Sequence, residues 1–220
     1  LGNNGLLGDG DIQWMTAGSG IIHQEMPKGN NKGEMHGFQL WANLPSNQKM
    51  TAPRYQDIKS NEIKSLVEDD GTIIKVIAGN YRGYNGPVDG IAAEPEYLDI
   101  YIPPLKFKKF PFDTRRQGFA YIFEGEGNFN NASKPVGVKV EKEFQGQEIE
   151  LRDLSGNRTL VVFDSGDEVA VQAGENGVRF LLISGTPIKE PVAWHGPIVM
   201  NSQEELRQAF NELNNGTFIK

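Results

Sequence analysis

Short apolar runs recur along the chain, and turn residues separate them. In residues 97–102, Leu or Ile occupies every even position, whereas Tyr or Asp occupies every odd one. Successive side chains of a strand point to opposite faces, so this alternation predicts a strand with one apolar face. Residues 178–183 are apolar almost throughout, which favours a strand covered on both faces. The predicted strands are residues 12–17, 21–26, 37–43, 72–78, 97–102, 118–123, 159–163, 168–172 and 178–184. Short strands separated by turns predict an all-β protein.

One helix is predicted, over residues 202–214 near the C-terminal end. Ser202 with Glu205 three residues later forms a capping-box pattern, which satisfies free backbone N–H groups at a helix start. Apolar side chains then recur at helical spacing and form one stripe, made of Leu206, Ala209, Phe210 and Leu213. Gly216 follows, as is common just past a helix end. The stripe predicts that this helix packs against a β domain.

A polar stretch divides the chain. Residues 59–65 lack the alternation of the flanking runs, and we interpret residues 59–66 as a linker. The predicted first domain is then residues 1–58. The second is residues 67–220, with the helix in its tail.

Charge and composition exclude several classes of function. The chain carries a net charge of −7 with a pI near 5.1, which argues against direct nucleic-acid binding through phosphate contacts. Its one basic cluster, at residues 106–109, is interpreted as a solvated strand edge. No apolar run approaches the roughly 20 residues that a membrane-spanning helix needs. The absence of cysteine excludes disulfides, thiolate metal sites and a cysteine nucleophile, and it fits a cytoplasmic protein. A nuclear location is the alternative if the source is eukaryotic.

The residues best placed for chemistry are His23 and Glu25. They lie two apart in the apolar run 21–26, which follows a turn at residues 18–20. In a strand both side chains project from the same face, so an imidazole nitrogen and a carboxylate oxygen lie side by side. Such a mixed donor pair suits iron, manganese or cobalt. Two ligands do not by themselves make a site.

Further pocket candidates lie on the next run. His36 opens it and is interpreted as a strand-end histidine beside the pocket. Gln39 and Trp41 share one face, and Phe38 and Leu40 share the other. The pattern alone leaves open which of these pairs lines the pocket.

Several longer segments resemble the pirin family, whose members are two-domain cupins. Residues 10–27 are similar to the family's signature segment, and residues 36–45 to its next strand. Residues 185–192 and 195–201 are similar to its closing segment. The resemblance covers nearly the whole chain. It implies a bicupin of two β-sandwich or jelly-roll domains, with a C-terminal helix.

The resemblance also implies a metal centre of three histidines and one glutamate. His23 and Glu25 match two of these four ligands. Pirins carry the other two in a His-Pro-His-Arg-Gly type of motif upstream, and this sequence has no such motif. We therefore expect the N-terminal part of the first domain to be missing from this chain. The implied cofactor is Fe(2+) or another divalent transition metal, at one site. No histidine lies between Ala78 and Trp194, so we expect no cupin-type centre in the second domain.

Two functions follow from the resemblance. The first is an iron-dependent dioxygenase of the quercetin 2,3-dioxygenase type acting on flavonols, in which Glu25 is both metal ligand and catalytic proton acceptor. The second is a non-enzymatic, metal-dependent regulatory protein that binds a transcription regulator or a metabolic enzyme. An acidic chain suits a basic protein partner better than DNA.

Overall fold

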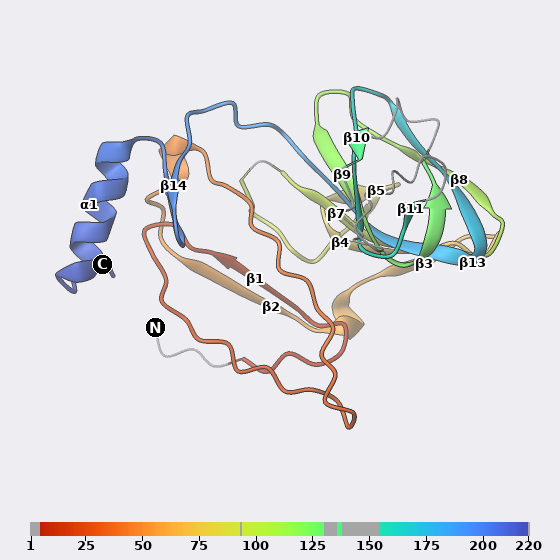
Figure 1. Ribbon diagram of the computed structural model, residues 1–220, viewed down its shortest axis with the longest axis horizontal. Helices are drawn as coiled ribbons and strands as arrows, with labels where there is room; N and C mark the ends of the chain where they lie inside the picture. The colour runs from red at the N-terminus through yellow and green to blue at the C-terminus, as the bar shows by residue number, and fades with distance from the viewer. Residues whose placement is uncertain (1–4, 93, 130–135, 138–154, 220) are drawn as a thin grey trace, which may run out of the picture. The chain divides into compact units, whose positions relative to one another are not determined.

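The computed structural model describes residues 5–92, 94–129, 136–137 and 155–219 (Figure 1). By contacts between residues the chain forms two compact units: Leu1–Gln13 with Asp57–Pro187, and Trp14–Gln56 with Ile188–Lys220. This grouping by contacts does not test the predicted domain boundaries. The domains 1–58 and 67–220, with the linker 59–66, therefore stay a prediction. In the described part of the chain, no helix has the length and apolar character needed to cross a membrane.

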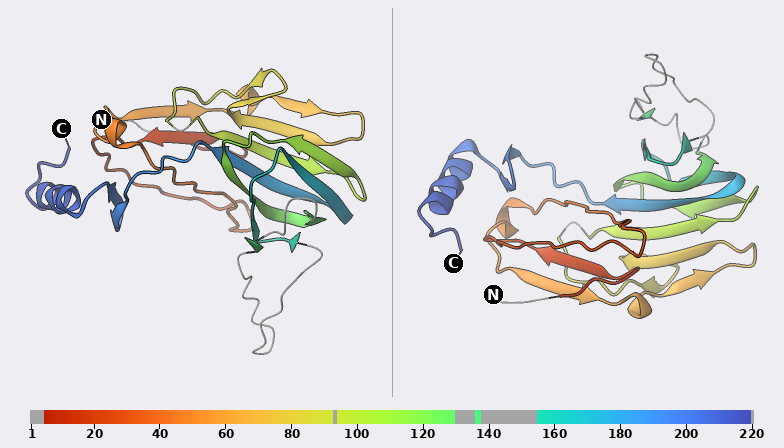
Figure 2. Two further views of the ribbon diagram at one scale, coloured as in Figure 1. Left: turned by 90° about the horizontal axis from the view of Figure 1, so that it is seen from above. Right: turned by 60° about the horizontal axis from the view of Figure 1, so that its bottom comes forward.

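In the part of the chain that the structure describes, the first unit contains one large antiparallel sheet of nine strands. Its order is β10-β12-β9-β13-β7-β4-β3, with β11 paired to β9 and β8 paired to β13. The strands lie side by side in both views of Figure 2. Their bounds are β3 Ser65–Val67, β4 Ile73–Ala78, β7 Glu96–Ile102, β8 Phe107–Pro111, β9 Gln117–Asn128, β10 Val136–Gly137, β11 Ser155–Gly156, β12 Thr159–Val162 and β13 Glu168–Gly185. The hairpin of β5 (Asn80–Tyr81) and β6 (Tyr84–Asn85) follows β4. The all-β prediction is confirmed.

The core of this unit lies on the face that the alternation predicted. Leu98, Ile100 and Ile102 of β7 are each 0% exposed, whereas Asp99 and Tyr101 between them are only partly buried. Aromatic rings fill the space beyond: Phe180 contacts Phe110 and Phe129 edge to face, with ring centroids 6.1 and 5.3 Å apart. Burying a side chain of this size is worth roughly 1.5–3 kcal/mol, so each of these residues stabilises the unit substantially.

Strand β13 replaces two predicted strands, residues 168–172 and 178–184. The chain continues through both, and its register against β9 shifts between Ala173 and Val178. Gly125 and Gly177 permit this irregularity. Both have positive φ, and a Cβ at Gly125 would lie 2.1 Å from the carbonyl oxygen of Gly177. The predicted gap is therefore a bulge within one strand.

Two of the predicted strands are wrong. The structure has a two-stranded sheet of β1 (Ile12–Thr16) and β2 (Arg54–Ile58), but residues 21–26 and 37–43 form no regular strand. A strand is stabilised by backbone hydrogen bonds to a neighbour, and no described strand pairs with either segment. The short 3-10 helices η1 (Ser46–Gln48) and η2 (Ser60–Glu62) follow in the chain.

The C-terminal helix is confirmed. Helix α1 spans Gln203–Asn214, next to the hairpin of β14 (Ala193–His195) and β15 (Ile198–Met200) (Figure 1). The Ser202 hydroxyl accepts a hydrogen bond from the backbone N–H of Glu205, which completes the predicted capping box. Leu206 is 5% exposed and packs with Ala193 and Ile198 of the hairpin. The predicted stripe is buried at Leu206 and Ala209 and partly buried at Phe210, whereas Leu213 at its end is 37% exposed.

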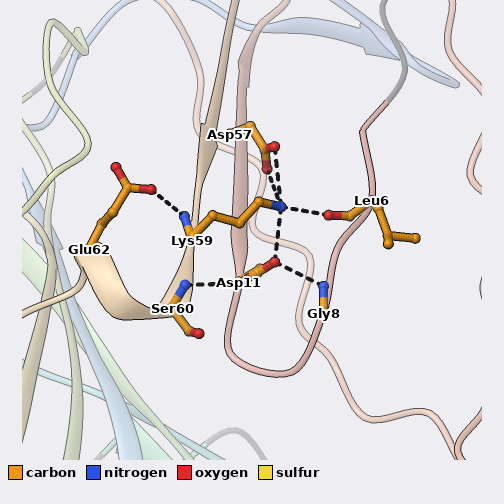
Figure 3. A network of polar contacts seen from close by, with 7 residues as sticks. All are labelled: Leu6, Gly8, Asp11, Asp57, Lys59, Ser60 and Glu62. Carbon is orange, nitrogen blue, oxygen red and sulfur yellow. Dashed lines mark hydrogen bonds and ion pairs between the residues drawn. The ribbon is translucent and has the colours of Figure 1, made fainter.

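A polar network in the first unit joins the segment before β1 to the segment after β2 (Figure 3). Asp11 accepts hydrogen bonds from the backbone N–H groups of Gly8 at 3.0 Å and Ser60 at 2.8 Å. The Lys59 ammonium lies 3.1 Å from the same carboxylate and also donates to the carbonyl oxygen of Leu6. The Gly8 and Ser60 hydrogen bonds and then the Lys59 contact lower the pKa of Asp11 to about 2.

The basic cluster is only partly a solvated edge. Lys109 fits that interpretation, since its half-exposed side chain pairs with Glu168 at 2.7 Å on the neighbouring strand. The side chain of Lys108 is only 15% exposed, and its ammonium forms ion pairs with Glu68 and Asp70. For Lys108 the prediction was wrong, because these carboxylates of the β3–β4 hairpin cover it.

Candidate metal centre

The side chains of His23 and Glu25 point toward each other, although their segment is not a regular strand. The imidazole Nε2 of His23 lies 3.6 Å from Oε1 of Glu25. Both side chains are open to solvent, at 45% and 59% exposure. The predicted pairing of an imidazole with a carboxylate is therefore present in the geometry, and both groups are accessible to an ion.

A closed turn follows this pair and reverses the chain. The Asn30 side-chain oxygen accepts hydrogen bonds from the backbone N–H groups of Lys32 and Glu34, at 2.8 and 3.1 Å. The backbone N–H of Asn30 donates to the carbonyl oxygen of Glu34. Gly33 has a φ of +76°, and a Cβ on Gly29 would lie 2.5 Å from the Gly33 backbone. Two glycines therefore let the turn close tightly.

The reversal brings Gln39 back to Glu25. Its Nε2 donates to Oε1 of Glu25 at 3.5 Å, across fourteen residues of sequence. Gln39 thus reaches the Glu25 carboxylate, while the face of this run that lines a pocket stays a prediction. His36 instead stacks edge to face on Phe38, with centroids 5.2 Å apart. The place of His36 in a substrate pocket stays a prediction.

The segment that bears His23 is held at its start by close backbone packing. The backbone N–H of Ser19 donates to the carbonyl oxygen of Thr51 at 2.8 Å. Gly18 has a φ of +53°, and a Cβ there would lie 2.1 Å from the same oxygen. The ring of Phe218 packs so close to Gly20 that a Cβ would meet it at 2.6 Å. The predicted turn at residues 18–20 thus requires both of its glycines.

A buried lysine holds the segment that follows Gln39. Lys49 is 5% exposed, and its ammonium donates to the side-chain oxygen of Asn43 and the carbonyl oxygen of Leu44, each at 2.7 Å. Burial lowers the pKa of Lys49, while the negative charges of Glu190 and Glu205 oppose this. Lys49 could not be identified from the sequence, because nothing in the local pattern distinguishes it from a surface lysine.

The donors present fit part of a metal site. A cation bound at the usual ~2.1 Å by both donors would hold them roughly 3.0 to 3.4 Å apart. The observed 3.6 Å between Nε2 and Oε1 requires only a small movement of two exposed side chains. Among the described residues, no group of three or more His, Cys, Asp or Glu side chains gathers in a way that could hold a metal. The spacing of the His23 and Glu25 donor atoms is thus compatible with both binding one ion.

The third histidine lies apart from this pair in the chain. His195 ends strand β14 and stacks on Phe210, with ring centroids 5.4 Å apart. Together with neighbours on α1 it lines an open hollow of about 520 Å³. Among the described residues, His195 makes no contact with His23 or Glu25.

Comparison with solved structures and family models identifies the fold class. The solved structure of a quercetin 2,3-dioxygenase from Acinetobacter baumannii superposes with a TM-score of 0.72 at 26% identity, over 95% of this chain and 67% of that one. The model of the pirin C-terminal cupin domain matches residues 97–219, and the pirin model matches residues 1–42. The fold is thus that of an all-β bicupin.

Relatives then identify the family. A pirin-like protein of Caulobacter vibrioides is 38% identical over 218 residues, which is 99% of this chain and 71% of the relative. The human protein named pirin is 36% identical over 97% of this chain and 67% of its own length. The chain belongs to the pirin family, as the sequence resemblance predicted.

Proposed function

We propose that this protein is a metal-dependent dioxygenase of the quercetin 2,3-dioxygenase type, with His23 and Glu25 as two of its metal ligands. The approach of the two donor atoms to 3.6 Å in an accessible position carries the proposal. The name of the Acinetobacter baumannii relative supports the reaction class. We take Fe(2+) as the metal and a flavonol-like molecule as the substrate, because the family resemblance implies both.

In this proposal the chain's own residues hold the ion and move a proton. His23 binds as a neutral imidazole through Nε2, the atom that faces Glu25. Glu25 offers a carboxylate that binds the ion and accepts the proton of a substrate hydroxyl. When bound, the metal acts as a Lewis acid that lowers the pKa of that hydroxyl. Donors beyond the described residues complete the ligand set.

The experiment is oxygen uptake with quercetin, together with metal content measured on the same sample. The sample is the completed protein, by which we mean this chain preceded by a segment that carries a His-x-His motif. We expect turnover that requires iron, and loss of both metal and turnover in His23→Ala and Glu25→Ala. Full metal retention in both variants would contradict the assignment of the pair. Intact metal without turnover would contradict the dioxygenase and favour the regulatory alternative.

A further inference from the structure

The oxygen of Glu25 that faces His23 has a second neighbour, and it comes from a different segment. Gln39 Nε2 lies 3.5 Å from this Oε1, and His23 Nε2 lies 3.6 Å from it. A glutamine side chain has two N–H donors and no charge, so it can orient a carboxylate without neutralising it. Its position therefore matches that of an outer partner to a metal ligand.

The turn at residues 30–34 helps to hold Gln39 in place beside Glu25. Glu25 is 59% exposed, and an exposed glutamate otherwise samples several rotamers. The hydrogen bonds of Asn30 fix where the returning segment begins, and the Lys49 contacts to Asn43 and Leu44 fix where it ends. Gln39 lies between these two anchors. Its amide can thus restrict the carboxylate before any ion binds.

We propose that Gln39 is a positioning residue of the metal site, holding the Glu25 carboxylate in the orientation that binds the ion together with His23. This inference rests on the proposed function. Partners that hold metal-ligating side chains typically change metal affinity by about 10- to 100-fold when they are removed. Gln39 acts through Glu25 and does not itself contact the ion.

The test is a titration of the 220-residue chain with Mn²⁺, followed by paramagnetic broadening of NMR signals, which detects weak binding. In the wild type we expect selective broadening at His23 and Glu25. Gln39→Met keeps an unbranched side chain of similar length but removes the donor, and it should weaken binding about 10-fold or more. Gln24→Ala is the matched control. It removes an exposed glutamine between the two ligands and should leave binding unchanged.

The outcomes separate the two proposals. Wild-type affinity in Gln39→Met overturns the positioning role, provided that His23→Ala and Glu25→Ala abolish the broadening. Absence of selective broadening in the wild type, or its persistence in both ligand variants, overturns the proposed metal pair instead. The NMR signals of the Gln39 side-chain amide give a readout independent of metal: they should shift in Glu25→Ala and stay unchanged in Glu204→Ala, which removes an exposed carboxylate on α1.

Discussion

At the scale of single residues, the carboxylate of Asp11 is held by donors from two segments far apart in sequence. Gly8 donates from its own turn, whereas Ser60 and Lys59 donate from beyond β2. These donors all favour the charged form, which is why the pKa of Asp11 falls to about 2 from an ordinary 3.8. A lowered carboxylate pKa means that the native state binds this proton less readily than the unfolded state does.

The stability of the chain should therefore depend on Asp11 in acid. Its contribution is complete above the unfolded pKa of 3.8 and is lost as the pH falls from there toward 2. Asp11→Asn should lower the urea midpoint near neutral pH and flatten its decline in acid. Asp9→Asn removes the same charge from an exposed position two residues away and is the control. Equal midpoints for wild type and Asp11→Asn at neutral pH would contradict the prediction.

At the scale of elements, the sequence predicted correctly those elements that a local residue pattern determines. Alternation located β7, and the capping box located the start of α1. The strand prediction was wrong for residues 21–26 and 37–43. A strand also needs a neighbouring strand to pair with, and no local pattern reveals whether one is present. The contact of Gln39 with Glu25 was undetermined for a similar reason. It depends on the register set by the turn at residues 30–34, while the period of two only sorted Gln39 and Phe38 onto opposite faces.

Helix α1 offers a matched pair of leucines to test how it is held. Leu206 is 5% exposed against the β14–β15 hairpin, whereas Leu213, two turns later, is 37% exposed. Leu206→Ala should destabilise the protein by about 2–5 kcal/mol, because it leaves a cavity where packing is closed. Leu213→Ala should cost about 1 kcal/mol or less. Urea unfolding of both variants, with hydrogen exchange of the tail, measures the difference. Equal effects would mean that the helix is not anchored through Leu206.

At the scale of the whole molecule, the proposed chemistry needs more donors than the described residues bring together. The family assignment and the fold followed from long segments whose order the sequence displays. The sequence predicted the metal site less completely than the fold, because the ligands of one site can lie far apart in the chain. His23 and Glu25 supply two donors, and a tight transition-metal site usually takes three or more protein ligands.

The 220-residue chain alone should therefore bind iron weakly and show no dioxygenase activity. With two protein donors, water fills the remaining coordination positions, and the ion exchanges into buffer during dialysis. The completed protein, with its added His-x-His segment, should retain about one metal per chain. Its His23→Ala and Glu25→Ala variants should again lose the ion, and His195→Ala should keep it, since that imidazole stacks on Phe210. Elemental analysis after dialysis compares all five samples. Tight, stoichiometric metal in the chain alone would show that the ion has more protein ligands than His23 and Glu25 provide. The assignment of this pair would then have to be abandoned.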